Sequence, residues 1–178
     1  SVVTLNLNSD GVVSLIEGSV DIGGSRASIA MQAAEVLCIP IEDIRPQVAS
    51  TDSVGYTDNT GGSRTTYATG MASYKAAGLM VDELKVRVSK IWDIEASDVE
   101  FDGGTFRARQ DAELQSMSMT FKELAGRIDG TGGPVAVTGS VDLADAAGAF
   151  GAHLVDLEVD LETGKTDVLR YSVVQDVG

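Results

Sequence analysis

The chain has 178 residues, of which 27 are acidic and 13 basic, so its formal net charge is −14 at pH 7. This charge opposes a sequence-independent grip on nucleic acid or on an anionic membrane, since both need clustered Lys and Arg. The single cysteine, Cys38, excludes an internal disulfide and a cysteine-built iron–sulfur or zinc site, and the single histidine, His153, leaves little for a His-rich metal centre. No apolar run approaches the ~20 residues of a membrane span.

Hydrophobic periodicity predicts strands and helices that interleave along the chain. Alternating apolar and polar residues favour strands, whereas apolar residues at helical spacing, such as Ile29, Ala33 and Leu37, favour helices. In chain order we expect a hairpin of strands at 2–8 and 12–17, a helix at 26–37, a strand at 44–49, a long helix at 63–91, a strand that turns at 102–104 into another at 105–109, a helix at 119–128 with a capping box, and strands at 134–139, 152–160 and 165–175.

This order lacks the strict strand–helix–strand rhythm of a parallel sheet and predicts an α+β fold with mixed, mainly antiparallel sheets and helices packed on them. No linker divides the chain, so we expect residues 1–178 to form a single domain. A helix, a short polar elbow and a strand occur twice, which predicts two loosely repeated units at about 1–60 and 61–110, before a closing strand region at 134–178. The last strand runs almost to the C-terminus, which favours a fragment of a larger subunit.

Two glycine-rich loops stand immediately before predicted helices. The first contains Gly23, Gly24, Ser25 and Arg26. Unpaired backbone amides and the helix dipole at such a position favour an anion, and an arginine can bind phosphate through two bonds. The loop is neither a P-loop nor a dinucleotide fingerprint, because the required Gly-Lys-Ser/Thr and Gly-x-Gly-x-x-Gly patterns are missing. The alternative is an ordinary strand-to-helix turn with Ser25 as the N-cap.

The second loop contains Gly61, Gly62, Ser63, Arg64 and Thr65. The helix behind it is rich in Ala, Gly and Ser, which favours close packing against a neighbouring element. One such loop is usually only a helix cap. Two loops that share Gly-Gly-Ser-Arg predict two helix N-termini presented to one polyanionic ligand, such as a pyrophosphate.

The remaining candidates have weaker support. His153 lies in an alternating strand, where a histidine is usually a packing residue, and Cys38 follows a helix end among apolar neighbours, which favours a small core residue. Asp21, Asp52 and Asp58 lie nearest the glycine loops, where a carboxylate can hold backbone amides as well as transfer protons. The sequence therefore names no general acid/base pair, and the catalytic residues stay unknown.

A series of motifs carries a resemblance to a known family. They are, in order, Gly18…Asp21-Ile-Gly-Gly…Ser28…Gln32-Ala-Ala-Glu, Ile39-Pro-Ile-Glu-Asp-Ile, Thr51-Asp…Thr60-Gly-Gly-Ser-Arg-Thr-Thr…Gly70, and Phe150-Gly-Ala-His-Leu-Val-Asp…Gln175-Asp-Val-Gly178. Each motif is modest by itself, but the ordered series covers most of the chain and is specific. It resembles the molybdenum-cofactor-binding large subunit of the molybdenum hydroxylases, the family of xanthine dehydrogenase, aldehyde oxidase and carbon monoxide dehydrogenase.

The resemblance implies a fragment of a molybdopterin-binding domain that holds the pterin dinucleotide of the molybdenum cofactor, in its cytosine form. Gly62, Ser63 and Thr65 match the family's cofactor-contacting loop, and Gly23 and Gly24 match the loop that approaches the ligands of the metal. The family usually has Gly-Gln-Gly in that loop, where the glutamine bonds a ligand of molybdenum. This chain has no glutamine there, a departure that bears on its reactivity.

The family's active-site glutamate would lie beyond residue 178, so we expect the isolated chain to be inactive and to provide no metal ligand. The resemblance implies a bacterial, cytoplasmic parent that hydroxylates an aldehyde or an N-heterocycle. That parent would pass electrons to iron–sulfur and FAD domains or subunits, with no nucleic acid or membrane partner. The alternatives are a non-catalytic relative whose loops bind another phosphate-bearing ligand or none, and a pure interaction module.

Overall fold

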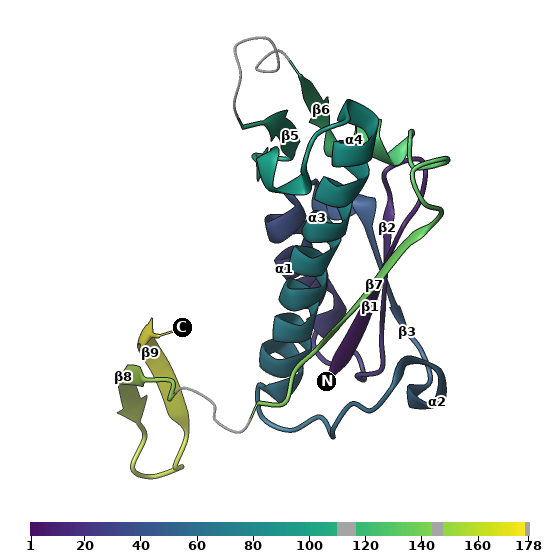
Figure 1. Cartoon of the computed structure of the whole chain (residues 1–178). Helices are drawn as coiled ribbons and strands as arrows, with labels where there is room; N and C mark the ends of the chain where they lie inside the picture. Colours follow the sequence, from purple (N-terminus) through teal and green to yellow (C-terminus); the bar gives the residue numbers. More distant parts are fainter. Residues whose placement is uncertain (110–116, 144–147, 177–178) are drawn as a thin grey trace. The chain divides into compact units, whose positions relative to one another are not determined.

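The computed structural model describes residues 1–109, 117–143 and 148–176 (Figure 1). Within them the chain divides into two compact units, Ser1–Asp142 and Leu143–Gly178. Helices and mainly antiparallel sheets occur together, which confirms the predicted α+β class. The single-domain organisation and the two repeated units stay predictions. The last two residues of the motif at 175–178 lie outside the described residues.

A four-stranded sheet forms the base of the first unit, in the order β3-β2-β1-β7. Its strands are β1 (Val2–Leu7), β2 (Val13–Glu17), β3 (Ile44–Val48) and β7 (Val135–Ser140). The β1–β2 hairpin and the β1–β7 pair are antiparallel, and the β2–β3 pair is parallel. Every second residue of β1 and β2 is buried, as the alternation in the sequence predicts.

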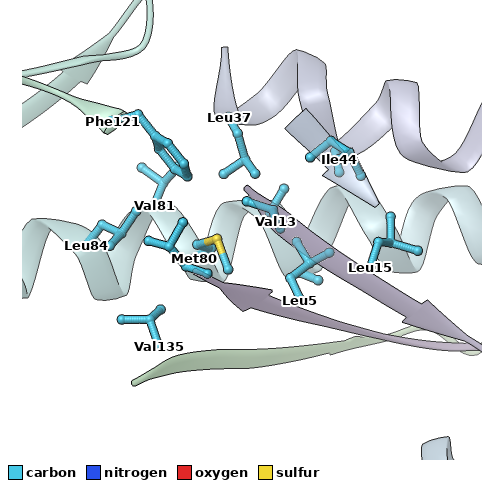
Figure 2. Close-up of a cluster of buried hydrophobic side chains, with 14 of the residues drawn as sticks. Leu5, Val13, Leu15, Leu37, Ile44, Met80, Val81, Leu84, Phe121 and Val135 are labelled. Carbon is cyan, nitrogen blue, oxygen red and sulfur yellow. The ribbon is translucent and has the colours of Figure 1, made fainter. Parts of the chain in front are cut away.

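Two helices cover one face of this sheet, α1 (Ser25–Leu37) and α3 (Gly70–Trp92), as Figure 1 shows. Their apolar sides meet the buried strand residues in one core, of which Leu5, Leu15, Leu37, Met80 and Leu84 are labelled in Figure 2. A π-helical turn, η2 (Thr65–Thr69), precedes α3, so the regular α-helix begins seven residues after the predicted start. The segment before it contains a one-turn helix, α2 (Thr51–Val54), which was not predicted.

Close packing of α3 against a strand, predicted from its small residues, is confirmed at Gly139 of β7. A Cβ atom at Gly139 would lie 2.5 Å from the amide nitrogen of Ala76 and closer still to the carbonyl oxygen of Ala72. No side chain fits in that space, because both neighbouring atoms belong to the helix backbone. The strand and the helix therefore touch backbone to backbone at this point.

A smaller sheet of three strands, β4 (Val99–Asp102), β5 (Thr105–Ala108) and β6 (Ser118–Thr120), completes the first unit together with α4 (Phe121–Ala125). The predicted capping box is confirmed, since Thr120 and Glu123 bond each other's backbone amides. The helix covers Phe121–Ala125 and is shorter than the predicted 119–128. It begins later than predicted because Thr120 is its extended N-cap and belongs to β6. Both predicted elbows are single 3₁₀ turns, η1 (Ile41–Asp43) and η3 (Ala96–Asp98).

The second unit is the predicted hairpin, formed by β8 (Gly151–Val159) and β9 (Thr166–Gln175). The strands pair antiparallel, with a shift of register between Asp156 and Leu157. The Asp160 side chain accepts hydrogen bonds from the amides of Glu162, at 2.8 Å, and Thr163, at 3.3 Å. These bonds hold the pKa of the Asp160 carboxyl below its usual value. The turn is therefore fixed by its own aspartate.

Candidate functional site

The loop between β2 and α1 exposes the backbone at two glycines. Gly23 has φ +58° and Gly24 has φ +82°, a left-handed conformation that L side chains rarely adopt. A Cβ atom at either position would meet nothing within 4 Å. In the described part of the chain, the amides of both residues have no hydrogen-bond partner. The loop therefore presents open backbone donors to whatever approaches it.

The first turn of α1, by contrast, is already capped. The Arg26 amide donates to Asp21 Oδ1 at 3.1 Å, and the Ser25 amide donates to the Ile22 carbonyl at 3.1 Å. The N-cap is Gly24, so the prediction of Ser25 as N-cap is wrong; Ser25 is buried, and its Oγ accepts from the Ile22 amide. The carboxylate of Asp21 thus makes the capping bond that was expected from the hydroxyl of Ser25, four residues later.

Each predicted site arginine is paired with an aspartate of its own loop. Arg26 Nε lies 2.7 Å from Asp21 Oδ2, and Arg64 Nε lies 3.5 Å from Asp58 Oδ2. Bonds from the Arg26 amide, and then from its side chain, hold the pKa of Asp21 below its usual value. The amide of Asn59 lowers the pKa of Asp58 in the same way. Both guanidinium groups thus lie at their loops, with part of their charge already balanced.

The second loop has the same character at its glycines. Gly62 has φ +57°, and a Cβ atom there would meet nothing within 4 Å. The amides of Gly61, Gly62 and Ser63 have no hydrogen-bond partner among the residues that the structure describes, and all three residues are exposed. Thr65 differs, because it is buried and its hydroxyl donates to Thr60 Oγ1 at 3.4 Å. Its hydroxyl therefore stabilises the loop from inside.

A buried contact links the two loops. Ser19 Oγ, in the first loop, lies 2.8 Å from Thr69 Oγ1 at the end of η2, and Thr69 Oγ1 lies 3.2 Å from Ser1 Oγ. Gln32 of α1 also donates from Nε2 to the carbonyl of Thr66, at 3.3 Å. The structure thus brings the two predicted loops to the same end of the helix layer. Neither Ser19 nor Thr69 is predicted as a site residue, since nothing in the local pattern around either of them marks it.

Glu17 lies at the base of the first loop and is 1% exposed. Its Oε2 accepts from the Ser19 amide, whereas its Oε1 has no hydrogen-bond partner in the described ranges. Burial raises the pKa of this carboxyl. The signal was present in the sequence, because Glu17 continues the buried alternation of Val13 and Leu15.

The weaker candidates lie elsewhere. Nδ1 of His153 lies 3.0 Å from the hydroxyl of Tyr171 in the second unit. Cys38 is exposed, so its assignment as a small core residue is wrong; it ends α1 in a left-handed conformation with φ +49°.

Over the described ranges, no helix is long and apolar enough to cross a membrane, and no three His, Cys, Asp or Glu side chains are grouped for a metal ion.

The fold and the loops define an α+β scaffold with two neighbouring clusters of open backbone amides. The family model of the molybdopterin cofactor-binding domain matches residues 1–178, so the chain belongs to this family. The resemblance to molybdenum hydroxylase large subunits is thereby confirmed.

Several curated relatives are similar over most of the chain. The carbon monoxide dehydrogenase large chain of Afipia carboxidovorans is 26% identical over 160 residues, which are 87% of this chain and 19% of that protein. The xanthine dehydrogenase molybdenum-binding subunit of Escherichia coli O157:H7 is 26% identical over 181 residues, 98% of this chain and 24% of that protein. The chain thus spans about a fifth to a quarter of the length of these relatives.

Solved structures share the fold. The crystal structure of the Cu,Mo-CO dehydrogenase matches 99% of this chain and 23% of its own, with a TM-score of 0.88 and 24% identity. Quinoline 2-oxidoreductase from Pseudomonas putida 86 matches the same shares, with a TM-score of 0.82 and 24% identity. At this identity the likeness concerns the fold alone.

Proposed function

We propose that the two glycine loops bind the pyrophosphate and pterin of a molybdopterin dinucleotide. The observation that carries the proposal is the set of five open amides, which belong to Gly23, Gly24, Gly61, Gly62 and Ser63. Backbone amides without nearby side chains allow close approach of a phosphate, and they donate to its oxygens without an added charge. Family membership supports this ligand over other polyanions.

We infer a limited part for the arginines in this site. Arg26 and Arg64 already balance Asp21 and Asp58, so neither is a free cation. Each would act as half of a fixed ion pair that holds its loop open. A phosphate would then be bound mainly by amides, with the guanidinium groups at the rim. This division differs from a site in which two free arginines clamp the anion.

The parent protein, in this proposal, is the large subunit of a bacterial, cytoplasmic molybdenum hydroxylase that acts on an aldehyde or an N-heterocycle. The cofactor, in its cytosine form, supplies the oxygen-transfer and redox chemistry when bound, and the residues of this chain bind and orient it. Iron–sulfur and FAD domains or subunits would receive the electrons. The isolated chain would be inactive, because it provides only part of the site.

A second candidate is a non-catalytic relative that binds another phosphate-bearing ligand. The specific observation in its favour is Gly24, which stands where the family usually has a glutamine and is a left-handed N-cap without a side chain. A glutamine at φ +82° would be strained, so the loop has a backbone suited to glycine.

The test begins with the molybdenum and pterin content of the full-length parent, purified from its native host. Near-stoichiometric amounts of both support the first proposal, and absence of both from a folded, assembled protein contradicts it. The matched variants are Gly62→Ala and Gly103→Ala. Gly103, in the β4–β5 turn, has φ +52° and equally open space, so both variants add similar backbone strain. Only Gly62→Ala is expected to lower the cofactor content.

A further inference from the structure

The π-helical turn η2 connects the second glycine loop to α3. A π-helix bonds each carbonyl to an amide one residue further along than an α-helix does, and such turns are rare and frequent at functional sites. Because one helical residue rotates the chain by about 100°, a change of η2 to the α register would rotate the preceding loop by a similar angle. The direction of the open amides of Gly61, Gly62 and Ser63 therefore depends on the register of η2.

The side chain of Gln32, on the neighbouring helix α1, contacts this turn. Its Nε2 donates to the carbonyl of Thr66 at 3.3 Å, and the same carbonyl also accepts from the amide of Gly70. Gln32 is half-buried, so part of this contact is shielded from water. The Thr66 carbonyl is thus held within the π-helical turn by a donor from outside the helix.

Gly70, the first residue of α3, provides the space for this contact. A Cβ atom at Gly70 would lie 2.5 Å from both Cδ and Oε1 of Gln32, and closer still to Nε2. The backbone of Gly70 is otherwise ordinary, with φ −61° and ψ −43°, a conformation that any L residue adopts in a helix. What the missing side chain provides at this position is therefore room for the Gln32 carboxamide.

A second polar contact joins the same two helices within the regular part of α3. Ser73 Oγ donates to the carbonyl of Ile29 at 3.0 Å, and both residues are completely buried. This bond ties α3 to α1 without touching η2. The attachment of the two helices to each other is therefore separable from the contact between Gln32 and the turn.

We propose that Gln32 is a positioning residue, which holds η2 in its π register and so directs the amides of the second glycine loop toward the ligand. It acts through the Thr66 carbonyl and does not itself have to touch the ligand. This inference rests on the proposed function, because the ligand in question is the molybdopterin dinucleotide.

Two variants of the full-length parent remove the contact in different ways. Gln32→Met keeps the length and the helix propensity of the side chain but has no donor. Gly70→Ala displaces the carboxamide, and since its methyl group meets only the end of a flexible side chain, α3 can accept it. The matched controls are Ser73→Ala, which removes the other bond between the helices, and Gly78→Ala, which adds a methyl group to α3 in open space.

Hydrogen exchange, resolved by peptide, is a readout separate from cofactor content. We expect Gln32→Met and Gly70→Ala to speed exchange over residues 61–70 about fivefold, the factor that one lost hydrogen bond provides, and to leave the rest of α3 unchanged. The molybdenum and pterin content per folded polypeptide should fall at least about twofold in both variants. Both controls should keep the wild-type content.

The opposite results are equally specific. Unchanged exchange over residues 61–70 would overturn the proposal, and so would faster exchange along the whole of α3, which indicates a structural contact only. Wild-type cofactor content in Gln32→Met and Gly70→Ala, beside a loss in Gly62→Ala, would overturn this inference and leave the proposed function standing. A wild-type parent without molybdenum and pterin would overturn both. If Gln32→Met does not fold, Gly70→Ala tests the same contact.

Discussion

The hydroxyl oxygens of Ser19 and Thr69 lie 2.8 Å apart and are almost completely buried. They connect the loop before α1 to the π-helical turn before α3, across fifty positions of the sequence. Neither residue belongs to the glycine motifs, yet their contact fixes how the two motifs face the same region. It is therefore the first contact to test.

We expect Ser19→Ala and Thr69→Val each to lower the free energy of unfolding by about 1 kcal/mol, because each leaves a buried hydroxyl with fewer partners. The double variant should cost less than the sum, since the two hydroxyls share one bond. Chemical denaturation in a double-mutant cycle measures this coupling. The matched control is the Thr4–Thr138 hydroxyl pair, at 2.9 Å and exposed, whose coupling should be near zero. Equal coupling in both pairs would contradict the assigned role.

The second prediction concerns two glycines that lie against or within α3. Gly139→Ala should destabilise the chain by about 2 kcal/mol or more, because the new methyl group meets helix backbone that cannot rotate away. Gly78→Ala should stabilise it by up to about 1 kcal/mol, since Gly78 lies within α3 and has open space around its Cβ position. Thermal unfolding of both variants gives the comparison, and effects of the same sign would refute it.

Glu17 leads to a prediction about pH. Burial raises the pKa of its carboxyl above the value in the unfolded chain, so the folded state holds the proton more tightly. Stability should therefore fall as pH rises from the unfolded pKa through the folded pKa, and then level off. The difference between wild type and Glu17→Gln isolates this contribution from the other acidic groups. A difference that is flat across that range would show that the carboxyl is not buried in solution.

Asp21 should behave in the opposite direction. Its pKa lies below the usual value, so its contribution to stability is present at neutral pH and is lost as pH falls through the folded pKa. Asp21→Ala should lower the melting temperature and speed hydrogen exchange of the Arg26 amide. Asp21→Asn should retain most of that protection, because its carbonyl oxygen can still accept the bond. The control is Asp10→Ala, which should affect the Val12 amide instead.

The sequence predicted the sheets and helices where the pattern is strong and local. Val3, Leu5, Val13 and Leu15 alternate over whole strands, and Thr120 with Glu123 forms a capping box within four residues. Short elements were missed for the same reason. The helix α2 has four residues and the strand β6 has three, too few for a period to be visible.

The candidate site was predicted in part. The glycine loops could be found because their residues are consecutive. The prediction of Ser25 as the N-cap is wrong because Asp21, four residues earlier, bonds the first turn of α1, and the left-handed glycines between them allow the chain to fold back that far. The Ser19–Thr69 contact had no local signal, since it depends on how two distant segments pack. Chemistry that depends on tertiary contacts cannot be inferred from spacing alone.

The backbone contact between Gly139 and Ala76 also constrains the order in which the chain can reach its final form. The loop that contains Gly62 leads into α3. Ala76 of α3 packs against Gly139 of β7, which follows it by more than sixty residues in the sequence. During synthesis, the first half of the chain therefore emerges before its second glycine loop has a fixed place. Maturation of this region should wait for β7, so the second glycine loop is expected to reach its final position only after the whole first unit has been translated.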